Sequence, residues 1–326
     1  MRPVYGTASG MRFVLPGGSG QVGQLLARAF QADGHDVVVL ARRPAPSAGR
    51  VVAWDGETLG PWAAELDGAD VVINLAGRSV NCRYTPANRA AMLDSRVHST
   101  RVVGEAIAQA ARPPALWIQA STATIYAHTF GPAHDEHGTI GGVEPGAPDT
   151  WRFSIEVATA WERALDAAST PRTRKVALRS AMTMSPDRGG VFDTLLELVR
   201  HGLGGTAGDG RQYVSWVHHE DFTRAIRWLI AHDDVAGPVN VSAPEPLPHA
   251  AFMRVLRDAW GTRIGLPATT WMLELGAVVI RTETELILKS RRVVPGLLLQ
   301  RGFDFRFPDW PSAARELVQA WRSVPS

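Results

Sequence analysis

Two residue types are nearly missing from this chain of 326 residues: cysteine occurs once, at Cys82, and lysine twice, at Lys175 and Lys289. A single cysteine excludes an internal disulfide and any metal site built from several cysteines, so we predict a cytoplasmic protein with a packed or surface thiol. The positive charge is almost entirely arginine. Because the formal net charge is only +2 and no basic block follows the chain, we expect no nucleic-acid partner.

Long apolar runs are also missing. Hydrophobic residues make up 45% of the chain, yet no uncharged apolar run approaches the roughly 20 residues of a membrane span. The longest candidate, residues 271–280, is too short and contains Glu274. Residues 1–10 lack the apolar centre of a secretory signal and are expected to form a loose extension. The composition therefore predicts a globular protein without a membrane partner. We also expect a monomer or homodimer that acts on a small-molecule substrate.

Glycine is placed where a nucleotide-binding turn needs it. The apolar run 11–15 is followed by Pro-Gly-Gly-Ser-Gly-Gln-Val-Gly at 16–23 and then by an amphipathic segment. Glycines in a strand–turn–helix context permit a tight turn, close approach of backbone N–H groups to a pyrophosphate, and close packing of the helix, whose N-terminus faces the anion. We therefore predict dinucleotide binding by Gly17, Gly18, Ser19, Gly20, Gln21, Val22 and Gly23.

Strand and helix patterns alternate along the first half of the chain. Strands are predicted at 11–15, 36–41, 51–54, 71–75, 115–120 and 175–179, and helices at 21–32, 86–111 and 150–168. This alternation predicts an α/β fold with a Rossmann-type, doubly wound parallel sheet. We expect the Rossmann domain to span 11–180, with 212–243 (strand 213–217, helix 221–232) returning to it. Residues 181–326 would mainly form a smaller C-terminal substrate lobe.

The end of the second strand indicates which nicotinamide cofactor is preferred. An acidic side chain there would grip the ribose hydroxyls of NAD, but the sequence reads Ala41-Arg42-Arg43. A guanidinium binds a 2′-phosphate through two parallel charge-assisted hydrogen bonds. We therefore predict NADP(H), held by Arg42 and Arg43; the alternative is two more solvated arginines in an arginine-rich chain.

Several further motifs together resemble the extended short-chain dehydrogenase/reductases, over about residues 11–320. These are Asn-Leu-Ala-Gly at 74–77, Ala-Ser-Thr-Ala-Thr-Ile-Tyr at 120–126 and Trp-Val-His-His-Glu-Asp at 216–221. Segments between 284 and 308 resemble the C-terminal domain of unknown function in one epimerase-like branch, which implies a family-specific tail at about 269–320. The resemblance implies that Leu75, Ala76, Gly77 and Ser121 bind cofactor. It also implies that Thr122 is the catalytic Ser/Thr, and that Tyr126 follows on a loop entering the substrate pocket.

The proton relay of these enzymes is missing. It consists of a tyrosine, which acts as acid and base, and a lysine four residues later, which lowers the tyrosine pKa. The tyrosines are Tyr5, Tyr84, Tyr126 and Tyr213, and none has a lysine four residues further on. Aligned on the Trp-Glu pair at 161–162, the chain has Ser154 at the tyrosine position and Ala158 at the lysine position.

Three functions therefore remain open. The first is an NADP(H)-dependent oxidoreductase or epimerase for a small polar carbonyl or hydroxyl compound, in which Thr122, Tyr126 or a bound water handles the proton. The second is an NADP(H)-binding redox-sensing or regulatory protein without turnover, and the third is a nonredox isomerase.

Other polar residues receive structural interpretations. The His- and acid-rich loop at 128–137 fits no zinc spacing, so we expect a solvated lid and no metal site. His218 is expected to be a structural hydrogen-bonding residue, and Asp221 to be a helix N-cap. The tryptophans are expected to lie in the core: Trp117, Trp151, Trp161, Trp216 and Trp228.

Overall fold

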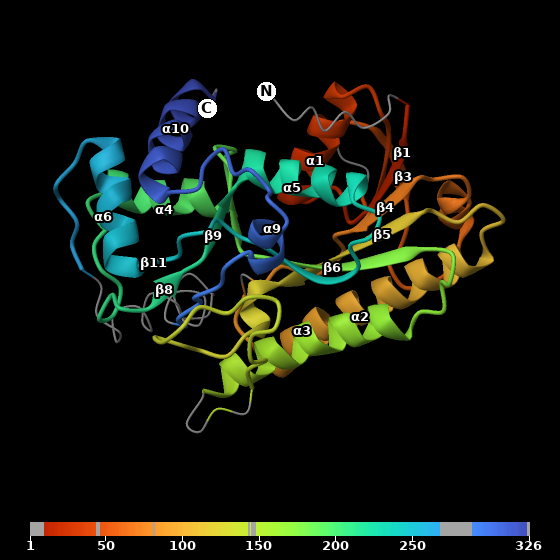
Figure 1. The fold of residues 1–326 in the computed structure, drawn as a ribbon, viewed down its shortest axis with the longest axis horizontal. Coiled ribbons are helices and arrows are strands. Elements are labelled where there is room, and N and C mark those ends of the chain that lie inside the picture. The colour runs from red at the N-terminus through yellow and green to blue at the C-terminus, as the bar shows by residue number, and fades with distance from the viewer. Residues whose placement is uncertain are drawn as a thin grey trace.

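A seven-stranded parallel sheet forms the centre of the computed structural model, which describes residues 10–43, 46–80, 82–142, 144, 148–267 and 289–324 (Figure 1). The strand order is β3-β2-β1-β4-β5-β6-β10. The strands are β1 (Arg12–Pro16), β2 (Asp36–Ala41), β3 (Arg50–Ala53), β4 (Val71–Asn74), β5 (Leu116–Thr122), β6 (Arg174–Ser180) and β10 (Gly237–Val241). The order reverses between β1 and β4, which is the switch point of a doubly wound sheet. The predicted fold class is confirmed.

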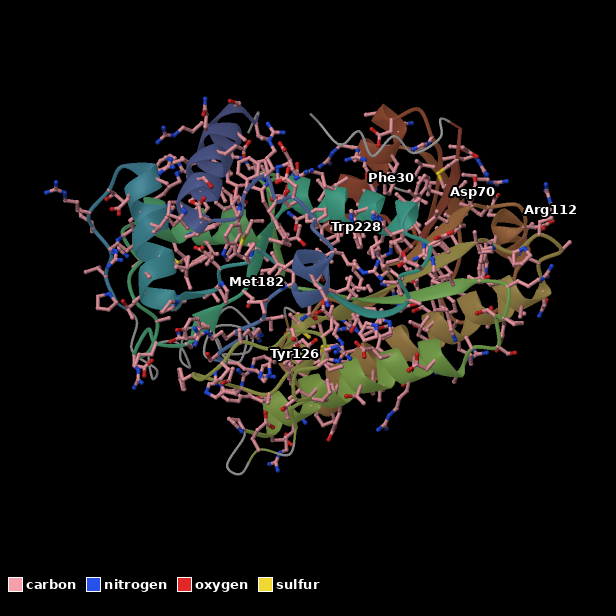
Figure 2. The ribbon with its side chains drawn as sticks, viewed as in Figure 1. Phe30, Asp70, Arg112, Tyr126, Met182 and Trp228 are labelled. Atoms are coloured by element: carbon pink, nitrogen blue, oxygen red, sulfur yellow. The ribbon has the colours of Figure 1, made fainter. Side chains whose placement is uncertain are left out.

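Helices cover both faces of this sheet. One face carries α1 (Gln21–Ala32) and α5 (His219–Ala231), and the other carries α2 (Pro86–Gln109) and α3 (Asp149–Ala167) (Figure 1). Because successive side chains of a strand point to opposite faces, Phe13 and Leu15 join the core beneath α1 and α5, whereas Val14 joins the core beneath α2. Phe30 of α1 and Trp228 of α5 lie on the first face (Figure 2).

A second core holds the C-terminal lobe together. It lies among α4 (Val191–Arg200), α6 (His249–Trp260) and α10 (Trp310–Ser323), where the rings of Phe252 and Trp310 stack 4.1 Å apart. Two small sheets border it, β7 (Met182–Met184) with β9 (Trp216–His218), and β8 (Tyr213–Val214) with β11 (Leu247–Pro248). The short helix α9 (Gly296–Gln300) packs on β10. Two 3-10 turns, Pro61–Leu66 and Ala123–Ile125, complete the described elements.

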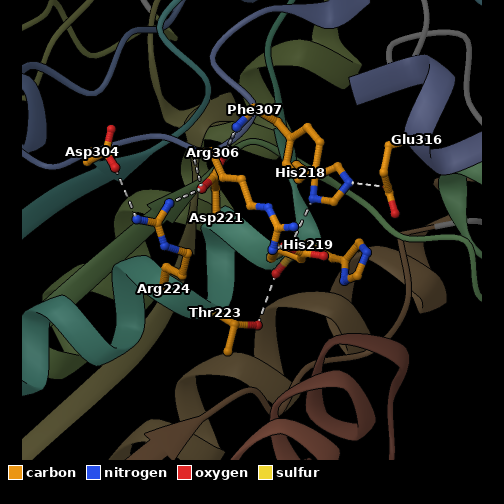
Figure 3. A network of polar contacts seen from close by, with 10 residues as sticks. His218, His219, Asp221, Thr223, Arg224, Asp304, Arg306, Phe307 and Glu316 are labelled. Atoms are coloured by element: carbon orange, nitrogen blue, oxygen red, sulfur yellow. Dashed lines mark hydrogen bonds and ion pairs between the residues drawn. The ribbon is translucent and has the colours of Figure 1, made fainter. Parts of the chain in front are cut away.

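Asp221 is not the N-cap of α5, and that expectation was wrong. His218 occupies the cap position, and its Nδ1 accepts the backbone N–H of Glu220 at 3.2 Å. Asp221 lies within the first turn and is buried, where its carboxylate accepts the backbone N–H groups of Arg306 and Phe307, each at 2.8 Å (Figure 3). Its role is to anchor the C-terminal segment onto α5.

The His- and acid-rich loop is only partly solvated, which also corrects the expectation: Phe130 and His137 are exposed, whereas His134 and Glu136 are partly buried. The His134 ring stacks on Tyr126 with centroids 5.3 Å apart. Glu136 accepts the backbone N–H groups of Asn240 and Leu297, each at 2.9 Å, and so ties the loop to β10 and α9. These hydrogen bonds join the loop to elements that lie far away in the sequence, so a local sequence pattern could not predict them.

Four of the five tryptophans singled out from the sequence are buried as expected: Trp117, Trp161, Trp216 and Trp228. Trp151 is partly exposed and packs beside the His128 ring. No helix in the described ranges is long and apolar enough to cross a membrane. The part of the predicted family-specific tail before Lys289 lies outside the described residues.

Candidate dinucleotide-binding site

A cavity of about 310 Å³ lies where β1, β2, β3 and β4 end. Half of its lining consists of residues predicted from the sequence to bind cofactor: Gly17, Ser19, Gly20, Arg42, Leu75, Ala76 and Gly77. The other half was not predicted: Trp54, Asp55, Gly56, Glu57, Arg78, Ser95 and Ser99. The cavity therefore occupies the place where open α/β sheets bind ligands, outside the carboxyl ends of the strands at the switch point.

The glycine loop presents backbone to this cavity. Gly17 has φ +74°, and a Cβ there would lie 2.6 Å from the backbone of Ala76. A Cβ on Gly23 would lie 2.4 Å from the backbone of Gly18, so the start of α1 packs directly on the turn. At Gly20, by contrast, the nearest atom would be 3.7 Å away. The residues present thus fit a pyrophosphate that approaches the backbone at Gly20.

Other residues predicted to bind cofactor point elsewhere. Val22 packs against the core beneath α1, and a Cβ on Gly190 would collide with the Gln21 side-chain amide. Arg43 is exposed and is absent from the cavity lining. Ser121 donates a hydrogen bond to Oε1 of Glu162 at 2.6 Å. Arg42 is thus the member of the arginine pair that faces the cavity.

The segment after β3 supplies an acidic wall that the sequence reasoning missed. Asp55 accepts hydrogen bonds from the hydroxyl and backbone N–H of Thr58 and from the backbone N–H of Glu57, and these bonds lower the Asp55 pKa to about 2. Asp55 is therefore ionised at neutral pH in the wall of the cavity that Arg42 also lines. The available signal was topological, because parallel strands end at the same edge of a sheet, so residues after β3 approach those after β2.

Thr122 ends β5, and its hydroxyl accepts the backbone N–H of Thr124 at 3.1 Å. Tyr126 lies nearby but is buried (Figure 2). Its hydroxyl donates to Oδ1 of Asn240 at 2.7 Å and accepts Nη1–H of Arg179 at 2.9 Å. Burial raises the pKa of this phenol. The Tyr126 hydroxyl is thus held by protein groups on both sides.

Arg179 connects Tyr126 to a buried ion pair. Its Nε and Nη2 donate to the two carboxylate oxygens of Glu162 at 2.8 and 2.7 Å. Burial acts to lower the pKa of Arg179, but the hydrogen bonds and charge of Glu162 outweigh it and keep that pKa above its ordinary value. Because Ser121 donates to the same carboxylate, one polar network links β5, β6, α3 and β10.

A second polar cluster lies at the start of α5. Potential ligand atoms of His218, His219 and Glu316 lie within 4.8 Å of one another (Figure 3). The two ring nitrogens of His218 are already used, since Nδ1 accepts the N–H of Glu220 and Nε2 bonds Glu316 at 2.7 Å. A metal at Nε2 would move the proton to Nδ1, where it would oppose that N–H. The cluster fits the structural histidine expected from the sequence.

The doubly wound sheet, the glycine turn and the cavity at the switch point define a Rossmann-type dinucleotide-binding fold. A family model described as the NAD dependent epimerase/dehydratase family matches residues 13–242, and one for a domain of unknown function, DUF1731, matches residues 268–317. The chain belongs to the NAD dependent epimerase/dehydratase family, and the resemblance inferred from the motifs is confirmed.

Similar proteins span nearly the whole chain. The human epimerase family protein SDR39U1 is 29% identical, with 94% of this chain and all of the human protein covered. An epimerase family protein of Staphylococcus epidermidis is 30% identical over 95% of this chain and 99% of its own length. A crystal structure of human SDR39U1 (isoform 2) with NADPH has a TM-score of 0.82 at 28% identity, covering 95% of this chain and 99% of that one.

Proposed function

We propose that this chain binds NADP(H) in the cavity and catalyses oxidoreduction or epimerisation of a small polar carbonyl or hydroxyl compound. The observation that carries the proposal is the cavity itself, which is lined both by the glycine turn, with its bare backbone, and by Arg42. The likeness to a human protein crystallised with NADPH supports the same cofactor.

Each part of the cavity has a distinct role in this proposal. Backbone N–H groups of the turn and the N-terminus of α1 stabilise the pyrophosphate. Arg42, assisted by Arg43, binds the 2′-phosphate. Leu75 to Gly77 border the nucleotide, and Thr122 orients the substrate oxygen from the end of β5. When bound, the cofactor supplies or accepts the hydride, and the protein contributes orientation and exclusion of water.

One observation favours the second candidate, a cofactor-binding protein without turnover. Ala158, at the lysine position of the missing relay, is 1% exposed and packs in an apolar cluster with Ile125 and Val293. Because Ala158 carries no charge, this position does not supply the cation that lowers the tyrosine pKa in the relay. A redox-sensing or regulatory role would need only the cavity.

Label transfer from the cofactor separates these functions. The protein is incubated with NADPH deuterated at C4 and a mixture of small aldehydes, ketones and hydroxy compounds, and products are examined by mass spectrometry. Deuterium in a product supports the oxidoreductase. Tight NADPH binding with no product supports the binding protein, and an unlabelled product isomer supports a nonredox isomerase.

A further inference from the structure

A buried arginine lies behind the cavity wall. The Arg96 residue is 9% exposed, and a Cβ on Gly77 would lie 3.1 Å from its guanidinium carbon. Its Nη1 donates to the backbone oxygens of Arg78 and Met92, each at 3.0 Å, and its guanidinium carbon lies 4.9 Å from the Trp161 ring centroid. None of the ion pairs found in the described residues involves Arg96.

Among the residues that the structure describes, therefore, no carboxylate forms an ion pair with Arg96. Burial lowers the Arg96 pKa to about 10, so the side chain stays charged at neutral pH. The titratable groups whose charges act on it are the phenol of Tyr84 and the thiol of Cys82. Buried cations are normally paired with an anion. A buried arginine without such a partner beside a ligand cavity therefore indicates that its partner is a bound ligand or a negative charge that develops during a reaction.

The hydroxyl of Tyr84 lies close to the position on α3 where the relay tyrosine of the family is expected. The Tyr84 hydroxyl lies 3.5 Å from Oγ of Ser154, the residue at the tyrosine position of α3. This separation is longer than an ordinary O–H···O hydrogen bond, as is common for catalytic groups without bound substrate. The phenol thus reaches the same place from a different segment of the chain.

Rigid elements hold the Tyr84 side chain. Its ring packs edge-on against Phe153 of α3, with centroids 5.4 Å apart, and its backbone oxygen accepts Nε–H of Arg89 at 3.1 Å. Thr85, the next residue, is the N-cap of α2. The start of α2, directly after Tyr84, and the Phe153 ring near the start of α3 therefore hold this position.

We propose that Tyr84 is the acid/base residue of the reaction proposed above, with Ser154 and Arg96 as positioning residues that replace the missing tyrosine–lysine pair. The inference rests on the proposed function. In the reducing direction the carbonyl carbon gains the hydride of NADPH, and the carbonyl oxygen takes the phenol proton. Alcohol, NADP⁺ and phenolate result, and a proton from water restores the phenol. Arg96 stabilises the phenolate by charge.

A titration tests the pairing without any substrate. The full chain is prepared with ¹³C-labelled tyrosine, and the resonance removed by Tyr84→Phe is followed against pH. Arg96→Met is expected to move the ionisation of this phenol upward by roughly one pH unit, because a nearby cation favours phenolate. Arg96→Lys should retain most of the wild-type behaviour, and Arg254→Met, at an exposed arginine of α6, should change nothing. Equal titration in wild type and Arg96→Met would overturn the pairing.

Label transfer tests the role. Tyr84→Phe is expected to slow deuteride transfer roughly 10²- to 10⁴-fold while NADPH affinity stays within about twofold. Tyr213→Phe, on β8, is the matched control and should transfer like wild type. Wild-type transfer by Tyr84→Phe would overturn this inference and leave the proposed function standing. A wild-type protein that binds no NADPH, or binds it without transfer, would instead overturn the proposed oxidoreductase.

Discussion

Of the two arginines proposed to bind the 2′-phosphate, Arg42 lines the cavity and Arg43 does not. We expect Arg42→Ala to weaken NADPH binding roughly 10- to 100-fold, because one or two charge-assisted hydrogen bonds are lost. The affinity for NADH should stay nearly unchanged. Arg43→Ala should weaken NADPH less, and Arg254→Ala not at all. Fluorescence titration of each reduced cofactor measures this, and equal losses for NADPH and NADH would remove the assignment.

The glycine turn offers a matched pair of substitutions. Gly23→Ala would place a Cβ 2.4 Å from the backbone of Gly18, so it should destabilise the fold by about 1–3 kcal/mol. Gly20 has φ −74° and open space around its Cα, so Gly20→Ala should keep the wild-type melting temperature and weaken NADPH binding by crowding the cavity. Thermal unfolding together with cofactor titration separates the two effects. Similar melting temperatures for both variants would contradict this packing.

The site was predictable where its residues follow one another in a motif. The spacing of Gly17, Gly20 and Gly23 and the arginines after the second strand needed only local sequence. Asp55 and Arg96 carry no local signal, because one depends on which strands end side by side and the other on how α2 packs against Trp161. The sequence alone therefore did not distinguish Asp55 from the other acidic residues, or Arg96 from the other arginines.

At the scale of elements, the Arg179–Glu162 ion pair joins β6 to α3. Glu162→Gln is expected to destabilise the protein by roughly 3–5 kcal/mol, because it leaves the Arg179 charge buried without its partner. The exposed Arg200–Glu197 pair on α4 is the control, since its side chains are 38% and 37% exposed, and Glu197→Gln should cost less than about 1 kcal/mol. Urea denaturation measures both, and equal changes would show that the network does not support the sheet.

His249, the first residue of α6, makes stability depend on pH. Burial lowers its pKa to about 4, so between about pH 6.5 and 4 the unfolded chain binds a proton that the folded chain does not. Its contribution to stability, up to roughly 3 kcal/mol, is present above pH 6.5 and is lost as the pH falls toward 4. His249→Gln should reduce this acid sensitivity. Denaturation midpoints at pH 7 and pH 4.5 test this, and the same loss in both proteins would contradict it.

Regular elements were predicted closely and their connections were not. The six strands and the helices predicted for the sheet fall within about two residues of those in the structure, because buried parallel strands and amphipathic helices have strong local patterns. The seventh strand, β10, was not predicted, and the strand predicted at 213–217 forms β8 and β9 of the two small sheets. The loop before α3 was expected to be solvated, but Glu136 binds backbone of β10 and α9. Asp221 was expected to cap α5, but it binds the chain 85 residues later.

At the scale of the whole molecule, the central sheet and the helices of the C-terminal lobe lie side by side (Figure 1). The sheet carries the cavity, and a separate core supports the lobe. Asp221 of α5 fixes the C-terminal segment to the sheet part, because its buried carboxylate accepts the backbone N–H groups of Arg306 and Phe307. We propose that the lobe formed mainly by residues 181–326 covers the substrate beside Thr122 and Tyr84. The family match explains the fold and leaves the substrate to be found by label transfer.

Calorimetric titration of the purified chain with NADPH, NADP⁺ and NADH tests the central claim most directly. We expect saturable binding of one NADPH per chain, and NADH binding at least about tenfold more weakly, because NADH has no 2′-phosphate for Arg42 to bind. Absence of saturable heat with both NADPH and NADP⁺ would contradict it.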